Sequence, residues 1–277
     1  MTSSHTQGRG RAAKSAARST KNETLTAAGR AGFSARGVVY VLIGALSIRI
    51  AVGSGGGQAD RQGALHEIAT KPFGEVMLWA LVVGFGAMAL WRASRAVLSR
   101  GPDHKAASRA LDAGRAVFYA FVCWGTAVYA AGGGQGSSSN EQSKDWTSSA
   151  LKLPFGQVLV GAAGCVLIGV GVVLAARAAM RKFLRRLDTG SMSPRTKQVV
   201  TALGVGGGVA RGTVFAAAGI FILVAAIQFD PDEAKGVDAT LRSFAQTPAG
   251  PWLLVAVAIG LILFGVFSFA SARYRRL

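Results

Sequence analysis

Six stretches of about twenty apolar residues dominate this chain, and a lipid bilayer severely restricts how such stretches can fold. A helix needs about 20 apolar residues to cross the hydrocarbon core, and backbone exposed to lipid must be helical or closed into a barrel. The stretches lie at residues 37–54, 74–92, 115–132, 155–176, 209–229 and 250–271. The sequence therefore predicts an all-α membrane protein with six transmembrane helices.

These stretches form pairs, and the pair recurs three times. The first stretch of each pair begins with an arginine motif, which is R-G-V-V-Y, R-A-V-F-Y or R-G-T-V-F. The second stretch follows a proline motif, which is P-F-G, P-F-G or P-A-G. A pair holds an even number of spans, so successive copies enter the membrane in the same direction. The pattern predicts three parallel two-helix hairpin repeats, over residues 31–98, 108–182 and 205–274, arranged as a pseudo-threefold bundle. The structural residues of the resuming motif are Pro72, Pro154, Pro248, Gly74, Gly156 and Gly250.

Charge predicts the orientation of these hairpins. Most of the 31 lysines and arginines lie before the first span, at residues 92–115 and 177–211, or at the C-terminus, and the remaining connections are poorly basic. This positive-inside asymmetry predicts an inner (plasma) membrane protein with both termini in the cytoplasm. It also accounts for the net charge of +18, so we expect the lipid bilayer, including its anionic lipids, as partner and no nucleic acid.

The connections differ in character. Residues 1–30 are small, polar and basic, which predicts a disordered cytoplasmic arm. Asp60 and Asp238 precede short apolar-patterned segments, which predicts short helices lying on the outer surface. The corresponding segment of the second copy, G-G-G-Q-G-S-S-S-N-E-Q, favours a flexible linker. Small residues four apart predict packing faces on two spans, at Gly161, Cys165 and Gly169 and at Gly208, Gly212 and Ala216.

The repeated arginines admit two interpretations. Arg36, Arg115 and Arg211 can extend to the headgroups and fix helix depth, with Tyr40 and Tyr119 one turn above at the interface. Alternatively, the three arginines converge near the bundle axis and bind a lipid phosphate or an anionic solute. Arg49 stands apart, in the outer half of the first span. It either extends outward or pairs with Glu75 or Asp230 at the outer helix ends.

The sequence offers little for catalysis. Cys123 and Cys165 both lie within spans, and the three histidines share no ligand spacing with cysteine or carboxylates. We find no nucleophile with a matching base and no phosphate-binding loop. The chain is therefore expected to be neither an enzyme nor a metalloprotein, and to need no cofactor.

The segments A-G-F-S-A-R-G-V-V-Y-V-L-I-G and G-A-L-H-E-I-A-T-K-P-F-G, with their weaker copies, resemble a bacterial membrane family, domain of unknown function 1206. The resemblance covers roughly residues 27–272. It implies three tandem two-helix repeats and a membrane location, and it brings no catalytic or ligand residues.

Two functional hypotheses follow. The leading one is a non-enzymatic structural, interaction or envelope accessory protein; the alternative is a transporter or binding protein for a lipophilic or anionic solute along the pseudo-threefold axis. The arrangement of Arg36, Arg115 and Arg211 distinguishes the two hypotheses. A structural role predicts that the arginines turn outward to the headgroups, whereas solute binding predicts that they surround a cavity. The sequence leaves the ligand, protein partners, homo-oligomerisation and physiological role open.

Overall fold

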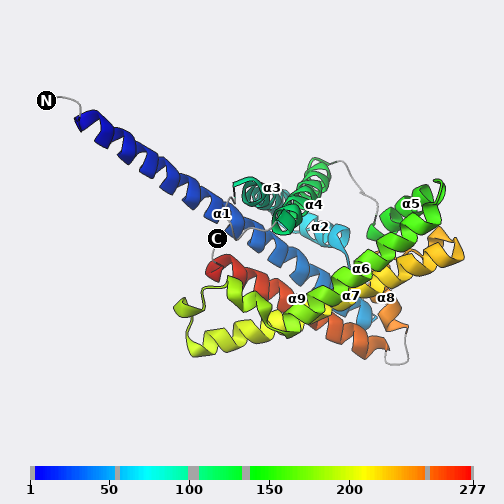
Figure 1. The fold of residues 1–277 in the computed structure, drawn as a ribbon. Helices are drawn as coiled ribbons and strands as arrows, with labels where there is room; N and C mark the ends of the chain where they lie inside the picture. Colours follow the sequence, from blue (N-terminus) through cyan, green and yellow to red (C-terminus); the bar gives the residue numbers. More distant parts are fainter. Residues whose placement is uncertain (1–3, 54–56, 99–105, 133–137, 247–249, 276–277) are drawn as a thin grey trace.

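The computed structural model describes residues 4–53, 57–98, 106–132, 138–246 and 250–275 (Figure 1). Within these ranges the chain is helical. The long helices are α1 (Ser4–Ala51), α3 (Gly74–Leu98), α4 (Ala106–Ala130), α6 (Gly156–Ala179), α7 (Pro194–Gln228) and α9 (Gly250–Tyr274). The short ones are α2 (Arg61–Ala69), α5 (Ser139–Leu151) and α8 (Val237–Ala245), with three single-turn segments, η1 (Lys182–Arg186), η2 (Thr189–Ser191) and η3 (Pro231–Glu233).

Among the described residues, five helices are long and apolar enough to cross a membrane, as in a multi-pass membrane protein. These segments are Glu23–Ala51, Gly74–Val97, Gly156–Ala179, Pro194–Gln228 and Gly250–Tyr274. The remaining long helix, α4, was expected as the third span. Its first half carries Arg109, Asp112 and Arg115, which lower its mean hydropathy.

The six long helices form a row in the order α4–α3–α1–α9–α7–α6. Neighbours from different repeats pack in cyclic order, since α3 contacts α4, α6 contacts α7 and α9 contacts α1. The two helices of the first repeat also pack together, as do those of the third. Within the described residues, no comparable interface joins α4 to α6. A contact between α4 and α6 would close the row into a ring. The ring is therefore interrupted between these two helices, inside the second repeat.

The three short helices lie at the same end of the long helices, here called the short-helix end. Their first residues form a cycle of hydrogen bonds. The Ser139 N–H donates to Asp60 Oδ2 (2.9 Å), and the Gly236 N–H donates to Asn140 Oδ1 (3.3 Å). The Ala59 N–H donates to Asp238 Oδ1 (2.7 Å) and closes the cycle. Each copy is thus joined to the next, and the third returns to the first.

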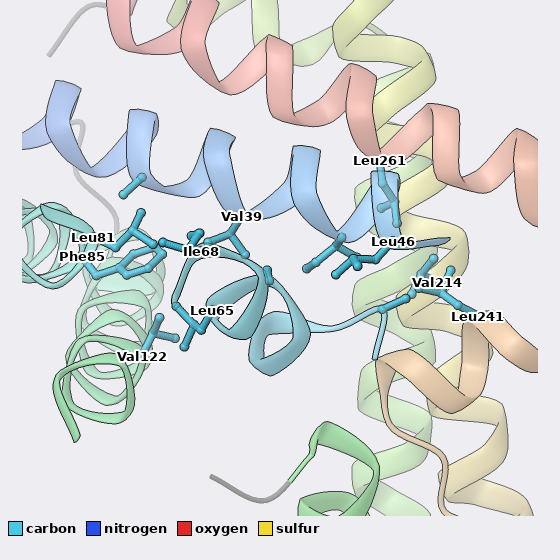
Figure 2. Packing of buried hydrophobic residues seen from close by; sticks show 14 of the residues in the cluster. Val39, Leu46, Leu65, Ile68, Leu81, Phe85, Val122, Val214, Leu241 and Leu261 are labelled. Carbon is cyan, nitrogen blue, oxygen red and sulfur yellow. The ribbon is translucent and has the colours of Figure 1, made fainter. Parts of the chain in front are cut away.

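Helix α2 forms where the sequence predicts a short helix after Asp60, and one of its faces is buried against the long helices. Leu65 is fully buried and Ile68 is 2% exposed, because both side chains insert between α1, α3 and α4 (Figure 2). Asp60 caps the helix by accepting from the Gly63 N–H (2.9 Å). From the first turn, Arg61 Nη1 donates to the Val122 carbonyl in α4 (3.4 Å). The interior therefore holds more polar groups than the spans alone suggest.

The P-F-G motif reverses the chain between a short helix and the next long one. Phe73 and Phe155 have φ values of 62° and 60°, the left-handed region that a bulky residue rarely adopts. The following glycines close the turn, and the Gly74 and Gly156 N–H groups donate to the Lys71 and Leu153 carbonyls (both 2.9 Å). A Cβ at either glycine would collide with a carbonyl of the preceding short helix. Gly250 is restricted in the same way by Ala245, whereas Pro248 lies outside the described residues.

Glycines on α6 and α7 bring those two backbones together. A Cβ on Gly171 would lie 2.5 Å from the Ala216 nitrogen, and one on Gly212 would lie 2.6 Å from the Gly171 carbonyl oxygen. Further along the same two helices, a Cβ on Gly164 would lie 2.9 Å from the Leu223 nitrogen, and one on Gly219 would lie 2.7 Å from the Ile168 nitrogen. Nothing lies within 4 Å of a Cβ on Gly169, and Cys165 is exposed. The α7 face matches the predicted stripe, but the α6 face is formed by other glycines than the predicted ones.

Two connections predicted to be irregular are helical. Helix α1 begins at Ser4 and projects beyond the other helices (Figure 1), in place of a disordered arm over residues 1–30. The arm is rich in alanine, lysine and arginine, which favour helix and extend the apolar segment that follows. Helix α5 begins in the expected linker, where Ser138 and Glu141 form a reciprocal capping box. Residues 133–137 of that linker lie outside the described residues.

Candidate functional site: an arginine-lined cavity

The first and third repeated arginines meet at one aromatic ring. Arg36 of α1 and Arg211 of α7 both place their guanidinium carbons over Phe264 of α9, 5.0 and 4.9 Å from the ring centroid. Arg36 Nε also donates to Ser268 Oγ (3.1 Å). Such cation–π contacts hold a guanidinium in place without neutralising its charge. The two arginines are thus positioned close together while both stay cationic.

The two predicted tyrosines surround the same place. The Tyr40 ring meets Phe264 edge-on, with centroids 4.8 Å apart, and Arg211 lies 5.6 Å from the Tyr40 centroid. Tyr119 of α4 is a side-chain neighbour of Arg36. Four of the five predicted site residues therefore cluster where α1, α4, α7 and α9 approach one another.

Arg115 lies beside this cluster, in an ion-pair network that the sequence did not indicate. Its Nη1 is 3.4 Å from Asp112 Oδ1, which also accepts from Arg92 Nη1 at 2.9 Å. Arg95 approaches the other oxygen of Asp112 at 3.4 Å. Arg92 is only 5% exposed, so this carboxylate is the counter-ion of a buried cation.

Two neighbouring cavities open among these arginines, with volumes of about 340 and 390 Å³. Five side chains line both of them: Arg115, Arg177, Arg185, Arg186 and Arg275. The first cavity adds Arg211 and Lys182, and the second adds Arg92, Arg95 and Arg109. Asp112 is the one carboxylate among the described residues that line them. We call the pair the basic cavity.

Several hydrogen-bond donors of the basic cavity lack partners. Among the described residues, Arg211 Nε and Ser271 Oγ have none in the first part, and Arg92 Nε has none in the second. Ser271 is 1% exposed. An unsatisfied buried polar atom costs about 1–3 kcal/mol, so the cavity offers donors that an acceptor-rich group would satisfy.

Arg275, which follows the last residue of α9, adds to this positive charge. Arg275 stacks over Phe33 (4.6 Å) and Trp91 (5.8 Å), and the Asp188 N–H donates to the Tyr274 carbonyl (2.8 Å), which anchors the chain end. Burial, and then the nearby charges of Arg92 and Arg36, lower the pKa of Arg275. Burial and neighbouring arginines likewise lower the pKa of Arg186. Both groups are thus partly buried cations with other arginines nearby.

This arrangement suits an oxyanion. Arginine presents a planar set of donors that matches phosphate or carboxylate, and it keeps its charge at physiological pH. It is a poor acid or base for the same reason. No group of metal-ligating side chains occurs within the described residues.

At the short-helix end, Arg49 pairs with neither residue expected for it. Its Nη1 lies 3.4 Å from Glu67 Oε2, and its side chain is 54% exposed. Sequence spacing does not indicate this pair, because it depends on how α2 packs against α1. Lys71 and then Arg49 lower the pKa of the Glu67 carboxyl.

The fold and the repeat pattern define a class, the multi-pass helical membrane proteins built from tandem hairpins. Three stretches of the chain, residues 31–99, 113–181 and 206–275, match the family described as Domain of Unknown Function (DUF1206). The chain belongs to this family, and the three tandem matches confirm the predicted resemblance. The chain is also 29% identical over 253 residues to the uncharacterized protein YxxB of Bacillus subtilis, covering 90% of each chain. No solved structure matches.

Proposed function

We propose that this protein is a six-span, non-enzymatic protein of the inner membrane and that its basic cavity binds the phosphate group of an anionic ligand on the cytoplasmic side. The observation that carries the proposal is the cavity itself. Its arginines and lysine far outnumber its single carboxylate, and some of their donors are buried without a partner.

The proposed sixth span is α4. It has 25 residues, which at 1.5 Å per residue is about 37 Å of helix, enough to cross the hydrocarbon core. Its charged residues lie in its first half and its apolar residues in the second, so the charges can stay at the cytoplasmic boundary. The cyclic order of the interfaces between repeats supports a pseudo-threefold bundle that is opened within the second copy.

The packing hypothesis requires the repeated arginines to turn outward with no cavity between them. Arg115 and Arg211 instead line the same space, and Arg36 neighbours Arg211 across Phe264. This arrangement favours ligand binding over a purely structural role. Extensive glycine contacts between α6 and α7 are what a scaffold also needs, so a structural or interaction role is the second candidate.

Thermal unfolding of the purified protein in a neutral detergent tests the proposal. Glycerol 3-phosphate should raise the Tm relative to potassium chloride of equal ionic strength, because a ligand of the folded state stabilises it by mass action. Arg211→Gln should weaken the apparent affinity by about tenfold or more, as expected for a charged hydrogen bond of about 1.5–3 kcal/mol. Arg49→Gln, at the opposite end, should bind like wild type.

Equal responses to phosphate and chloride would refute the proposed anion site. An equal loss in Arg211→Gln and Arg49→Gln would show that the response reflects overall charge and not the cavity. Either result would leave the scaffold role as the better candidate.

A further inference from the structure

A third, apolar cavity of about 500 Å³ lies in the interrupted part of the ring. Its walls come from α4, α5, α6 and α7, and include Phe121, Leu159, Leu167, Val214 and Phe215. These side chains cannot satisfy a polar solute. They can bury hydrocarbon.

The apolar cavity continues the basic cavity along the same three helices. On α7, Arg211 lines the basic cavity and Phe215, one turn of about 5.4 Å further on, lines the apolar one. On α6 the step from Leu174 to Leu167 is about 10 Å, and on α4 the step from Arg115 to Phe121 is about 9 Å. The two spaces therefore lie end to end, and we call them together the slot.

The slot exists because the two long helices of the second repeat, α4 and α6, do not pack against each other over their described residues. Helices α1 and α3 pack together, as do α7 and α9, whereas α4 and α6 face each other across the slot. Of the five candidate spans, α6 has the smallest buried share. A gap between two spans gives a molecule in the bilayer lateral access to the interior.

The dimensions and chemistry of the slot point to one kind of occupant. From Leu174 to Leu159 the lining of α6 extends about 22 Å, which exceeds the half-thickness of about 15 Å of the hydrocarbon core. One end carries unpaired arginine donors, and most of the remaining lining is apolar, with Lys235 and side chains of α5 adding polar groups. A free phosphate would fill only the basic end, and a helix of a second copy would leave the arginines without an anion.

We propose that the slot holds an anionic phospholipid of the cytoplasmic leaflet, with its phosphate on Arg115 and Arg211 and an acyl chain between α4 and α6. This inference rests on the proposed function and specifies its ligand. Ordinary bilayer lipids that are zwitterionic are disfavoured, because their own cation would face the arginines.

The test separates the headgroup from the acyl chain. Full-length protein in neutral detergent is titrated with dioleoyl phosphatidic acid, dioleoyl phosphatidylcholine and glycerol 3-phosphate, and Tm is measured. In wild type, phosphatidic acid should bind at least tenfold more tightly than glycerol 3-phosphate, and phosphatidylcholine should not stabilise. Ala163, exposed on α6, lines the apolar cavity, so Ala163→Trp should fill the slot without disturbing the core. This variant should lose at least tenfold in phosphatidic acid affinity and keep its response to glycerol 3-phosphate.

Ala162→Trp is the matched control, since Ala162 is also exposed on α6 and does not line the cavity. The inference is overturned if Ala163→Trp binds phosphatidic acid like this control, or if the acyl chains add nothing to the affinity of glycerol 3-phosphate. No response to any phosphate compound would instead refute the proposed function. Strong binding of phosphatidylcholine, lost in Ala163→Trp, would mean an apolar site without the predicted headgroup selectivity and would also overturn the inference.

Discussion

Asp112 has an unusual position because it is the one carboxylate among the described residues that line the basic cavity. It lies within 2.9 Å of buried Arg92 and 3.4 Å of Arg95 and Arg115. Breaking a buried ion pair costs more than the pair itself contributes, because the surviving charge stays desolvated. The carboxylate therefore stabilises the fold while it lowers the positive potential of the basic cavity.

Replacement of this carboxylate should be strongly destabilising. Asp112→Asn should lower the free energy of unfolding by about 3 kcal/mol, measured by thermal or denaturant unfolding in detergent. Asp232→Asn is the control, since its pair with Lys144 involves an aspartate side chain that is 80% exposed, and such pairs contribute about 0–1 kcal/mol. Similar effects of the two substitutions would contradict the role assigned to Asp112.

At this scale the sequence predicted some of the site and missed the rest. The repeated motif singled out Arg36, Arg211, Tyr40 and Tyr119, which the structure brings together around Phe264. Arg92 and Arg275 belong to no repeated motif. They reach the cavity through the packing of α3 and the C-terminus, which periodicity cannot reveal.

At the scale of elements, the contact between α6 and α7 depends on which glycines face the partner helix. Spacing by four residues predicted Gly161, Cys165 and Gly169, yet the close approaches are made by Gly164 and Gly171, seven residues apart. Several small residues on α6 give more than one plausible stripe. The crossing of the two helices selects among them, and sequence spacing alone does not.

Two substitutions on α6 distinguish these stripes. Gly171→Val should destabilise the protein by about 3 kcal/mol or prevent folding, because the new side chain would meet the backbone of α7. Gly169→Val should be nearly neutral, since nothing lies within 4 Å of a Cβ there. Expression level and Tm in detergent provide the comparison. Comparable losses in both variants would mean that the helices cross at a different register.

The short helices show where local signals were sufficient and where they were not. The capping box of Ser138 and Glu141 is visible in the sequence and could have predicted α5. The burial of Leu65 and Ile68 could not be predicted in this way, because α2 is only nine residues long and its depth is set by α1, α3 and α4.

At the scale of the whole molecule, the proposed topology places the short-helix end outside the cell and the basic cavity inside. Residues Ser149 and Ser191 lie at opposite ends of the bundle, and both are exposed. In a variant lacking Cys123 and Cys165, a cysteine at residue 149 should react with a membrane-impermeant maleimide in intact cells. A cysteine at residue 191 should react only after the cells are opened.

The reverse labelling pattern would place the basic cavity outside and refute the proposed orientation. Labelling of both cysteines in intact cells would mean that α6, the candidate span between residues 149 and 191, does not cross the membrane. Fold class and repeat number were thus accessible from the sequence, whereas the interruption of the ring was not. Hydropathy does not distinguish a packed pair of helices from a separated one.

The cycle at the short-helix end has a consequence for gene architecture. Asp60 binds the second copy, Asn140 binds the third, and Asp238 binds the first. These three hydrogen bonds do not depend on which copy is translated first. A circularly permuted reading frame that starts at the second copy and finishes with the first would encode the same three closures. The hydrogen bonds at the short-helix end therefore do not require the copies to follow one another in the order found in this chain.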